Sequence, residues 1–393
     1  MRPRPAGDLW LLAGVLVLLV FGLLMVWSTT QYVPPKPVIA EAADNAEQSP
    51  AVSPAGSRIL KQLAWALIGV ALMLIFKRVD YRRLNHPAWA LGGMALSLAL
   101  LGLVYFVDGD RHRFLRAGPV GLQPSELAKP ALVVFLAYFL TERAKVLNDS
   151  RVLAPAAMTV GLMAGAVMVA DVGTAVVLVA TTAALFLVAG LERRYFALAG
   201  AVTAVFLVIA ILSEPYRLAR VLAYLDPQLK IVAWLGVRDI VEPYLAKSKG
   251  ARDPTYHAKQ SLVAVGSGGL LGRGPMKGEH KLGYLPEAHN DFIYAVVGEE
   301  LGLVGSSLLL ALFVIILWRG MRLARSALDD FGRYLALGVT TLIVFQAFMN
   351  MSVVLGLAPT KGIPLPMISY GGSSLACTLI LFGMLLSVSD RTP

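Results

Sequence analysis

The chain has 393 residues, of which 57% are hydrophobic and only 15% charged, and its formal net charge is +10. Soluble domains hold about 25% charged residues, so this composition excludes a soluble globular protein and indicates an integral membrane protein. Lys and Arg lie mainly between apolar segments, as membrane topology requires, and therefore do not indicate nucleic acid as a partner. The single cysteine, Cys377, excludes an intrachain disulfide and a thiol-based metal site.

The apolar segments predict ten membrane spans when they are counted with a window of roughly 19 residues, so the predicted fold class is an all-α polytopic membrane protein. No clear cleavage site follows the first segment, which predicts that it is retained as a helix. Basic residues of the short connections fall on one side, which predicts cytoplasmic termini. The predicted spans are 9–29, 59–76, 87–107, 125–142, 152–170, 173–190, 195–213, 291–318, 332–357 and 367–388.

Two long loops lie on the external side of this single membrane domain, 1–393. Residues 34–58 are rich in Ala, Pro, Ser and Glu, which predicts a flexible loop. Residues 214–290 are longer than a connection requires, and we predict short amphipathic helices there that enclose a site. The Gly-rich run at 266–274 lacks the Lys-Ser/Thr of a phosphate-binding loop, so it does not indicate a nucleotide site.

The first polar constellation lies at the start of the fourth span. External arginines, including Arg113, break the positive-inside pattern, and Ser125, Glu126 and Lys129 follow within one helical turn. Glu126 and Lys129 are three residues apart and can meet on one face. The pair either packs the bundle as a neutralised ion pair or forms a cationic wall of an external cavity.

Three further charged residues allow two interpretations each. Asp171 either caps the sixth span or adds a carboxylate to an external pocket. Arg217 and Arg220, three residues apart where the seventh span ends, either grip phosphate as guanidinium forks or anchor the chain at lipid headgroups.

The polar loop before the eighth span turns into an apolar helix at Asp291. An Asp there can cap the helix, but a cap requires neither Glu287 nor His289 upstream. Glu299 and Glu300 follow about two turns further, and carboxylates within a membrane are costly and usually mark a cavity or pathway. We therefore interpret this stretch as a functional site.

Polar residues return near the end of the chain. Gln346 and Asn350 lie four apart on the ninth span, where amides either bind neighbouring helices or line a channel. The sequence PTKGIPLPMISYGGSSL at 359–375 predicts irregular backbone at membrane depth, which is tolerated where it is buried in protein or lines a cavity.

Three sequences resemble, in the same order, signatures of the SEDS family (shape, elongation, division and sporulation) of bacterial cell-wall glycosyltransferases. They are QPSELAK at 123–129, LPEAHNDFI with GEELG at 285–302, and LPMISYGGSS at 365–374. The EAH before the Asp and the PTKG sequence at 359–362 are more similar to the division member than to the elongation member. The chain departs from the family pattern at Phe114, Val169, Ala170, His257, Asn290 and an insertion at about 231–253.

The resemblance implies polymerisation of lipid II, an undecaprenyl-pyrophosphate-linked disaccharide peptide, on the outer face of the bacterial cytoplasmic (inner) membrane. It also implies a class B penicillin-binding protein and other divisome proteins as partners. A sugar hydroxyl must attack a carbon that bears pyrophosphate, so the site requires a base and positive charge. Asp291 is the predicted base, and the predicted substrate-binding residues are Glu287, His289, Glu126, Lys129, Ser125, Arg113, Arg217, Arg220, Lys361, Ser369, Tyr370 and Ser373.

We also expect a divalent cation, Mg or Mn, that Asp291 and Glu287 could hold, and no organic cofactor. Three alternatives remain open: a lipid II flippase, an elongation-specific polymerase and a non-catalytic scaffold. The concentration of polar residues at the external end favours the enzyme, because a transporter should place them near the membrane midplane.

Overall fold

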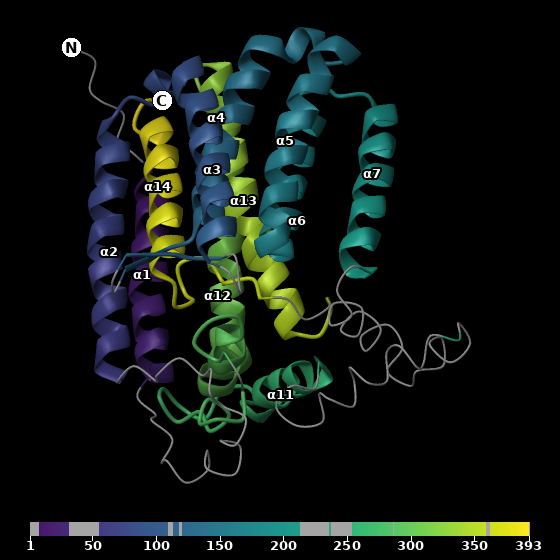
Figure 1. The fold of residues 1–393 in the computed structure, drawn as a ribbon. Helices are drawn as coiled ribbons and strands as arrows, with labels where there is room; N and C mark the ends of the chain where they lie inside the picture. The colour runs from purple at the N-terminus through teal and green to yellow at the C-terminus, as the bar shows by residue number, and fades with distance from the viewer. Residues whose placement is uncertain are drawn as a thin grey trace, which may run out of the picture.

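The computed structural model describes residues 8–30, 55–108, 113–117, 120–212, 236, 254–285, 287–358 and 362–392. Most of them form a bundle of long helices that run side by side (Figure 1). Its longer helices are α1 (Leu9–Thr30), α2 (Ala55–Arg78), α3 (Pro87–Val107), α4 (Pro124–Arg143), α5 (Ser150–Ala170), α6 (Val172–Val188), α7 (Arg193–Leu212), α11 (Pro254–Ser267), α12 (Ile293–Ser326), α13 (Asp330–Val354) and α14 (Gly372–Ser389). Two short 3-10 helices are η3 (Tyr81–Leu84) and η4 (Ala144–Val146).

The mostly helical fold is confirmed, and each predicted span overlaps one of these helices. Among the described residues, seven helices are long and apolar enough to cross a membrane: α1, α2, α3, α5, α12, α13 and α14. The exact number of spans and their orientation remain predictions.

The helix pair α2 and α14 packs closely because small residues face the partner. A Cβ added at Gly383 would lie 2.6 Å from the Met73 carbonyl oxygen, and Gly69 faces Leu379. Small residues let helix backbones approach one another within a membrane, where van der Waals packing drives association. Helix α13 packs in turn against α12, α4 and α6, so α13 and α14 form the buried centre of the bundle.

The structure departs from the prediction at several boundaries. Helix α2 begins at Ala55, so the last residues of the predicted loop 34–58 are helical, whereas residues 31–54 lie outside the described part. Helix α12 continues to Ser326, because arginines that end an apolar window do not end a helix. Helix α14 begins at Gly372 and not at residue 367.

The predicted long loop and the connection before α4 both contain regular structure. Helix α11 lies inside the loop 214–290, as predicted, whereas the insertion at 231–253 is outside the described residues except for residue 236. A small antiparallel hairpin, β1 (Leu115–Ala117) with β2 (Val120–Leu122), was not predicted, so the fold is mostly but not entirely helical.

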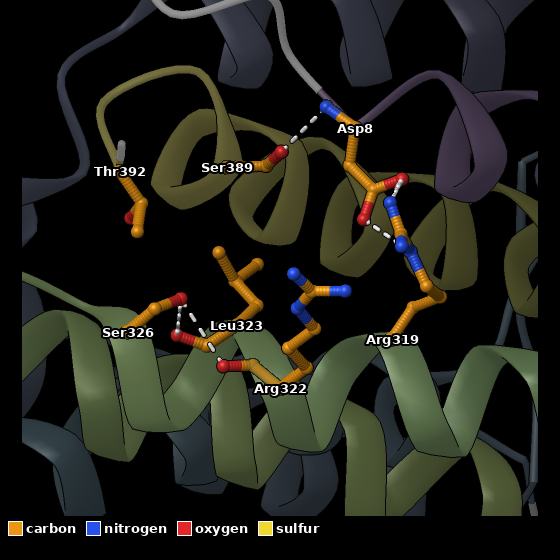
Figure 2. A pocket seen from close by; sticks show the side chains of 7 residues that line it. All are labelled: Asp8, Arg319, Arg322, Leu323, Ser326, Ser389 and Thr392. Carbon is orange, nitrogen blue, oxygen red and sulfur yellow. Dashed lines mark hydrogen bonds and ion pairs between the residues drawn. The ribbon is translucent and has the colours of Figure 1, made fainter.

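The start of α1 and the end of α14 meet at one end of the bundle, which we call the chain-end side. The Asp8 amide donates to Ser389 Oγ at 2.8 Å, and the Asp8 carboxylate accepts from Arg319 at 2.7 and 2.5 Å. Figure 2 shows these contacts at the edge of a pocket of about 170 Å³ between α12 and α14, into which Arg322 points. Helix α11 lies at the opposite end, which we call the α11 side (Figure 1).

Candidate functional site

Asp291 lies in the turn that leads into α12. The amides of Asn290 and Phe292 both donate to the Glu287 carbonyl, at 2.9 and 3.4 Å, which closes the turn. Helix α12 begins at Ile293, and the N-cap position belongs to Phe292, whose side chain cannot cap. The half-buried Asp291 therefore lies two residues before the first helical position.

Helix α13 fixes this turn through one amide side chain. Asn350 Nδ2 donates to the Asp291 carbonyl at 2.8 Å and to the Ile363 carbonyl at 2.7 Å. A Cβ added at Gly362 would lie 2.6 Å from Asp291 Oδ2, so the chain after residue 361 runs directly against the carboxylate. The predicted Lys361 lies outside the described residues. The hydrogen-bonding interpretation of Asn350 is confirmed.

The segment before α14 forms a second support for the turn. Ser369 Oγ donates to the Asn290 carbonyl at 2.6 Å and accepts from the Leu365 amide at 2.7 Å. The Tyr370 amide donates to the His289 carbonyl at 2.9 Å, and the rings of these two residues lie 5.7 Å apart. The segment is irregular, as predicted, and it holds the backbone on the N-terminal side of Asp291.

Helix α2 contributes residues that sequence reasoning missed. Gln62 is buried and its Oε1 accepts from the Gly371 amide at 3.2 Å, which fixes the start of α14. Burial lowers the pKa of His289, Glu287 opposes this shift, and the positive charge of Arg58 adds to it. The charge of Arg58 therefore reaches His289, which lies in the turn before Asp291. The only sequence signal for Gln62 and Arg58 was that each is a polar residue near the start of an apolar span.

Glu126 and Lys129 meet as predicted, deep inside the bundle. Lys129 Nζ donates to both carboxylate oxygens of Glu126 at 2.9 and 2.8 Å and to Gln346 Oε1 at 2.9 Å. The side chain of Lys129 is 2% exposed and that of Glu126 is 1% exposed. Gln346 Nε2 donates onward to the Pro364 carbonyl at 2.8 Å, so this network joins α4, α13 and the segment that follows Gly362. An ammonium group has three N–H donors, and three protein acceptors occupy them here.

Two further predicted serines, Ser125 and Ser373, join α4 to α14. Gln123 donates from Nε2 to Ser125 Oγ at 2.9 Å and from its amide to Ser373 Oγ at 3.3 Å. Both serines are buried, and together they join the first turn of α4 to the first turn of α14.

Arg113 and Asp171 form a charged pair beside these elements. Asp171 accepts from the Thr174 amide at 3.1 Å and from Thr174 Oγ1 at 2.8 Å, so its predicted capping of α6 is confirmed. An Arg113 terminal nitrogen lies 3.5 Å from the Asp171 carboxylate, and Arg113 Nε is buried without a hydrogen-bond partner among the described residues. Gly173 packs against Ile363, which places the pair next to the chain that Asn350 holds. Arg217 and Arg220 lie outside the described residues.

The two carboxylates further along α12 are occupied by the preceding loop. Glu299 accepts from the Glu279 amide at 2.8 Å and contacts His280 Nδ1 at 2.9 Å. Glu300 accepts from Ser28 Oγ at 2.6 Å and from the Met276 amide at 2.9 Å. Lys281 also pairs with Glu300. Both carboxylates are almost fully buried, so they fasten a loop and do not mark a pathway.

The Gly-rich run explains how that loop can reach α12. Gly302 has φ 65° and ψ −161° and forms a kink, and a Cβ there would collide with the Gly272 amide. A Cβ at Gly272 would in turn collide with the Glu300 carbonyl. Only glycine populates this region of backbone space readily. The run therefore serves close backbone packing against α12.

The predicted divalent cation would use the Asp291 turn. Within the described ranges, no group of three or more His, Cys, Asp or Glu side chains is arranged to hold one. Mg²⁺ and Mn²⁺ can, however, bind through one or two carboxylates together with substrate phosphates. Glu287 and Asp291 share one turn, and this donor set fits such an ion.

Within the described residues, a bundle whose helices are long and apolar enough to cross a membrane, with a braced carboxylate turn at one end, defines a multi-pass membrane protein. The chain belongs to the FtsW/RodA/SpoVE family: the family model described as "Cell cycle protein" matches residues 9–392. A protein of Geobacter metallireducens named "Probable peptidoglycan glycosyltransferase FtsW" is 39% identical over 84% of each chain. Stage V sporulation protein E of Bacillus subtilis is 36% identical over 84% of this chain and 86% of its own.

Solved structures agree with this assignment. A chain from a structure titled "Structural coordination of polymerization and crosslinking by a peptidoglycan synthase complex" aligns with TM-score 0.71 and 26% identity over 98% of this chain and 99% of that one. The rod shape-determining protein RodA of Thermus thermophilus aligns with TM-score 0.63 and 25% identity over 98% and 97%. The resemblance found in the sequence, and its greater similarity to the division member, are thereby confirmed.

Proposed function

We propose that this peptidoglycan glycosyltransferase polymerises lipid II during cell division, with Asp291 as its general base. The observation that carries the proposal is the bracing of the Asp291 turn from both sides. Asn350 binds the carbonyl of Asp291 itself, and Ser369 binds the carbonyl of the preceding residue, Asn290. A base must be held in a fixed position relative to the hydroxyl that it deprotonates, and supporting hydrogen bonds provide that rigidity.

In the proposed reaction, the hydroxyl oxygen of the acceptor sugar attacks the anomeric carbon of the donor. The Asp291 carboxylate takes the hydroxyl proton, the new C–O bond forms, and the bond to the pyrophosphate breaks with its electrons leaving on oxygen. The unpartnered Nε–H of Arg113 and the charge of Arg58 support an assignment as groups that stabilise this leaving pyrophosphate. Mg or Mn held by Glu287 and Asp291 would supply further positive charge there.

The remaining predicted residues have two proposed roles. Arg217, Arg220 and Lys361 complete the cationic surface for pyrophosphate. Ser125, Ser369, Tyr370, Ser373 and the pair of Glu126 and Lys129 position the loops, and the ring of His289 meets the ring of Tyr370 edge-on.

The proposed topology has ten spans, cytoplasmic chain ends and the α11 side on the outer face. The basic connections support this orientation, because cytoplasmic loops carry an excess of Lys and Arg. A class B penicillin-binding protein is the proposed partner, together with other divisome proteins. The structural relative that belongs to a complex for polymerization and crosslinking supports a crosslinking partner.

The flippase alternative receives less support from the buried charges. A transporter would place polar groups on a path near the midplane. Glu126, Lys129, Glu299 and Glu300 are instead engaged by protein groups. The relatives named FtsW also favour the division enzyme over the elongation-specific polymerase.

The test compares Asp291→Asn with wild type, using fluorescent lipid II, a divalent cation and the partner. We expect polymer on a gel to fall by roughly 10²–10⁴, the usual loss for a general base, with expression and partner binding unchanged. Asp330→Asn, an exposed acidic residue in the first turn of α13, is the control for the same chemical change. Wild-type polymerisation by Asp291→Asn would end the assignment, and scrambling in liposomes without polymerisation would indicate a flippase. The scaffold alternative instead predicts normal division with Asp291→Ala.

A further inference from the structure

A second cavity lies between α3, α4 and α5, away from the Asp291 turn. Its volume is about 310 Å³, at the lower end of the range of small-molecule sites. Helix α4 starts next to Ser373 on the α11 side and spans 20 residues, so its last residue, Arg143, lies toward the chain-end side. The cavity is lined by the C-terminal part of α4 from Phe135 to Arg143 and by residues within the first two turns of α3 and α5.

The lining has two chemically distinct parts. Phe135 and Phe139 of α4 and Leu91 of α3 form an apolar wall, and Leu91 is 53% exposed, so the cavity opens sideways out of the bundle. Arg143 and Arg151 form a cationic rim at the end of this wall. We define the whole as the α3–α5 slot.

We propose that the α3–α5 slot binds an anionic phospholipid, with the headgroup phosphate on the two arginines and an acyl chain along the apolar wall. The proposal rests on the orientation given above, which places the slot at the inner leaflet. Basic pockets between helices on that side suit anionic headgroups, because guanidinium groups bind phosphate oxygens with charge-assisted hydrogen bonds. The sideways opening provides the path by which a lipid enters.

Charge supports a phosphodiester as the ligand. Neither guanidinium makes a hydrogen bond or ion pair with another side chain among the described residues. Glu142 adds one negative charge to the two positive charges of the rim, which leaves one net positive charge. A phosphodiester carries one negative charge, so the slot and the headgroup match.

The pocket of Figure 2 shows that basic residues on this side need not form such a slot. Arg319 there is already occupied by Asp8, and the other lining residues include the hydroxyls of Ser326, Ser389 and Thr392. Positive-inside topology accounts for arginines in both places. It does not account for an aromatic wall that lies between three helices next to Arg143 and Arg151.

The experiment uses the full chain in detergent with short-chain phosphatidylglycerol, and measures bound lipid by native mass spectrometry together with the melting temperature. We expect Arg143→Gln with Arg151→Gln to weaken phosphatidylglycerol binding by about thirtyfold. Arg322→Gln with Arg325→Gln, which removes the same charge from the same side of the bundle, should leave binding unchanged. Val152→Trp should fill the slot while keeping both arginines, and should also abolish binding.

Each outcome decides the proposal. Equal losses in the two double variants would reduce the effect to general surface charge and overturn it. Unchanged binding by Val152→Trp would overturn the slot as the site, even if the arginine variant failed to fold. If phosphatidylcholine, which has no net charge, bound as tightly as phosphatidylglycerol, the role of the anionic headgroup would be overturned. If inorganic phosphate alone raised the melting temperature as much as phosphatidylglycerol, the slot would be a site for free anions instead. Loss confined to Arg143→Gln with Arg151→Gln and Val152→Trp would establish the lipid slot.

Discussion

In the described part of the chain, two pairs of neighbouring charged residues are buried, each pair on one helix, and protein groups satisfy them differently. Glu126 and Lys129 lie on one helix and neutralise each other, with Gln346 as a further acceptor. Glu299 and Glu300 lie side by side on α12 and bind backbone amides and side chains of the preceding loop. The first pair therefore joins helices, and the second fastens a loop. The role of a buried carboxylate follows from its partners, and depth in the membrane alone does not reveal it.

The largest effect should come from Lys129→Met, which leaves Glu126 buried without its cation. Breaking one side of a buried ion pair costs about 3–5 kcal/mol of stability, whereas the double variant with Glu126→Gln should be neutral or stabilising. Melting temperatures measure both. Polymerisation assays then decide between the open alternatives: loss in the folded double variant indicates contact with pyrophosphate, and near-normal activity leaves only packing.

Gly302→Ala should loosen the loop that Glu299 and Glu300 bind, while leaving both carboxylates in place. The backbone at Gly302 lies in a region that costs other residues about 1–3 kcal/mol, and the new methyl group collides with Gly272. We expect a lower melting temperature and easier proteolysis of the loop at 273–281. Gly165→Ala in α5, where a Cβ meets open space, is the matched control and should be neutral or slightly stabilising. A variant as stable as wild type would contradict the close backbone packing.

Glu299→Gln sharpens the comparison with a smaller change. It keeps the shape of the side chain but removes the charge that the Glu279 and His280 amides bind. Hydrogen bonds to charged groups contribute about 1.5–3 kcal/mol, so we expect a loss of about 2 kcal/mol. Hydrogen exchange should accelerate at residues 276–285 and stay unchanged in α14. Uniform acceleration across the bundle would mean that Glu299 supports the helices instead.

The smallest effect concerns pH and the turn itself. Burial lowers the pKa of His289 below its ordinary value of about 6.5, so the folded state prefers the neutral ring. The unfolded chain then binds the proton first, and the stabilising contribution is complete above about pH 6.5 and is lost as pH falls toward the folded pKa. Melting temperatures at pH 7.5 and pH 5.5 should therefore differ more for wild type than for His289→Gln. An equal difference in both proteins would contradict this assignment.

The sequence predicted what depends on local pattern. Apolar windows located the helices to within a few residues at many ends, and the motif around Asp291 identified the turn. Contacts that brace this turn were not predictable, because Asn350 and Ser369 lie 59 and 79 residues from their partners. The same holds for Gln62, which reaches Gly371 across 309 residues. No local pattern encodes such pairings.

The contact between Asp8 and Ser389 bears on how the chain assembles. These residues are 381 positions apart, and Arg319 is 311 positions from Asp8. Synthesis proceeds from the N-terminus, so α1 is made before α12 and α14, which supply Arg319 and Ser389 as partners of Asp8. Helix α1 can already pack against α2, but Asp8 gains these two partners late and until then must stay hydrated at the membrane surface. Synthesis of α14 then completes the contacts that join the start of α1 to the chain-end side of the bundle.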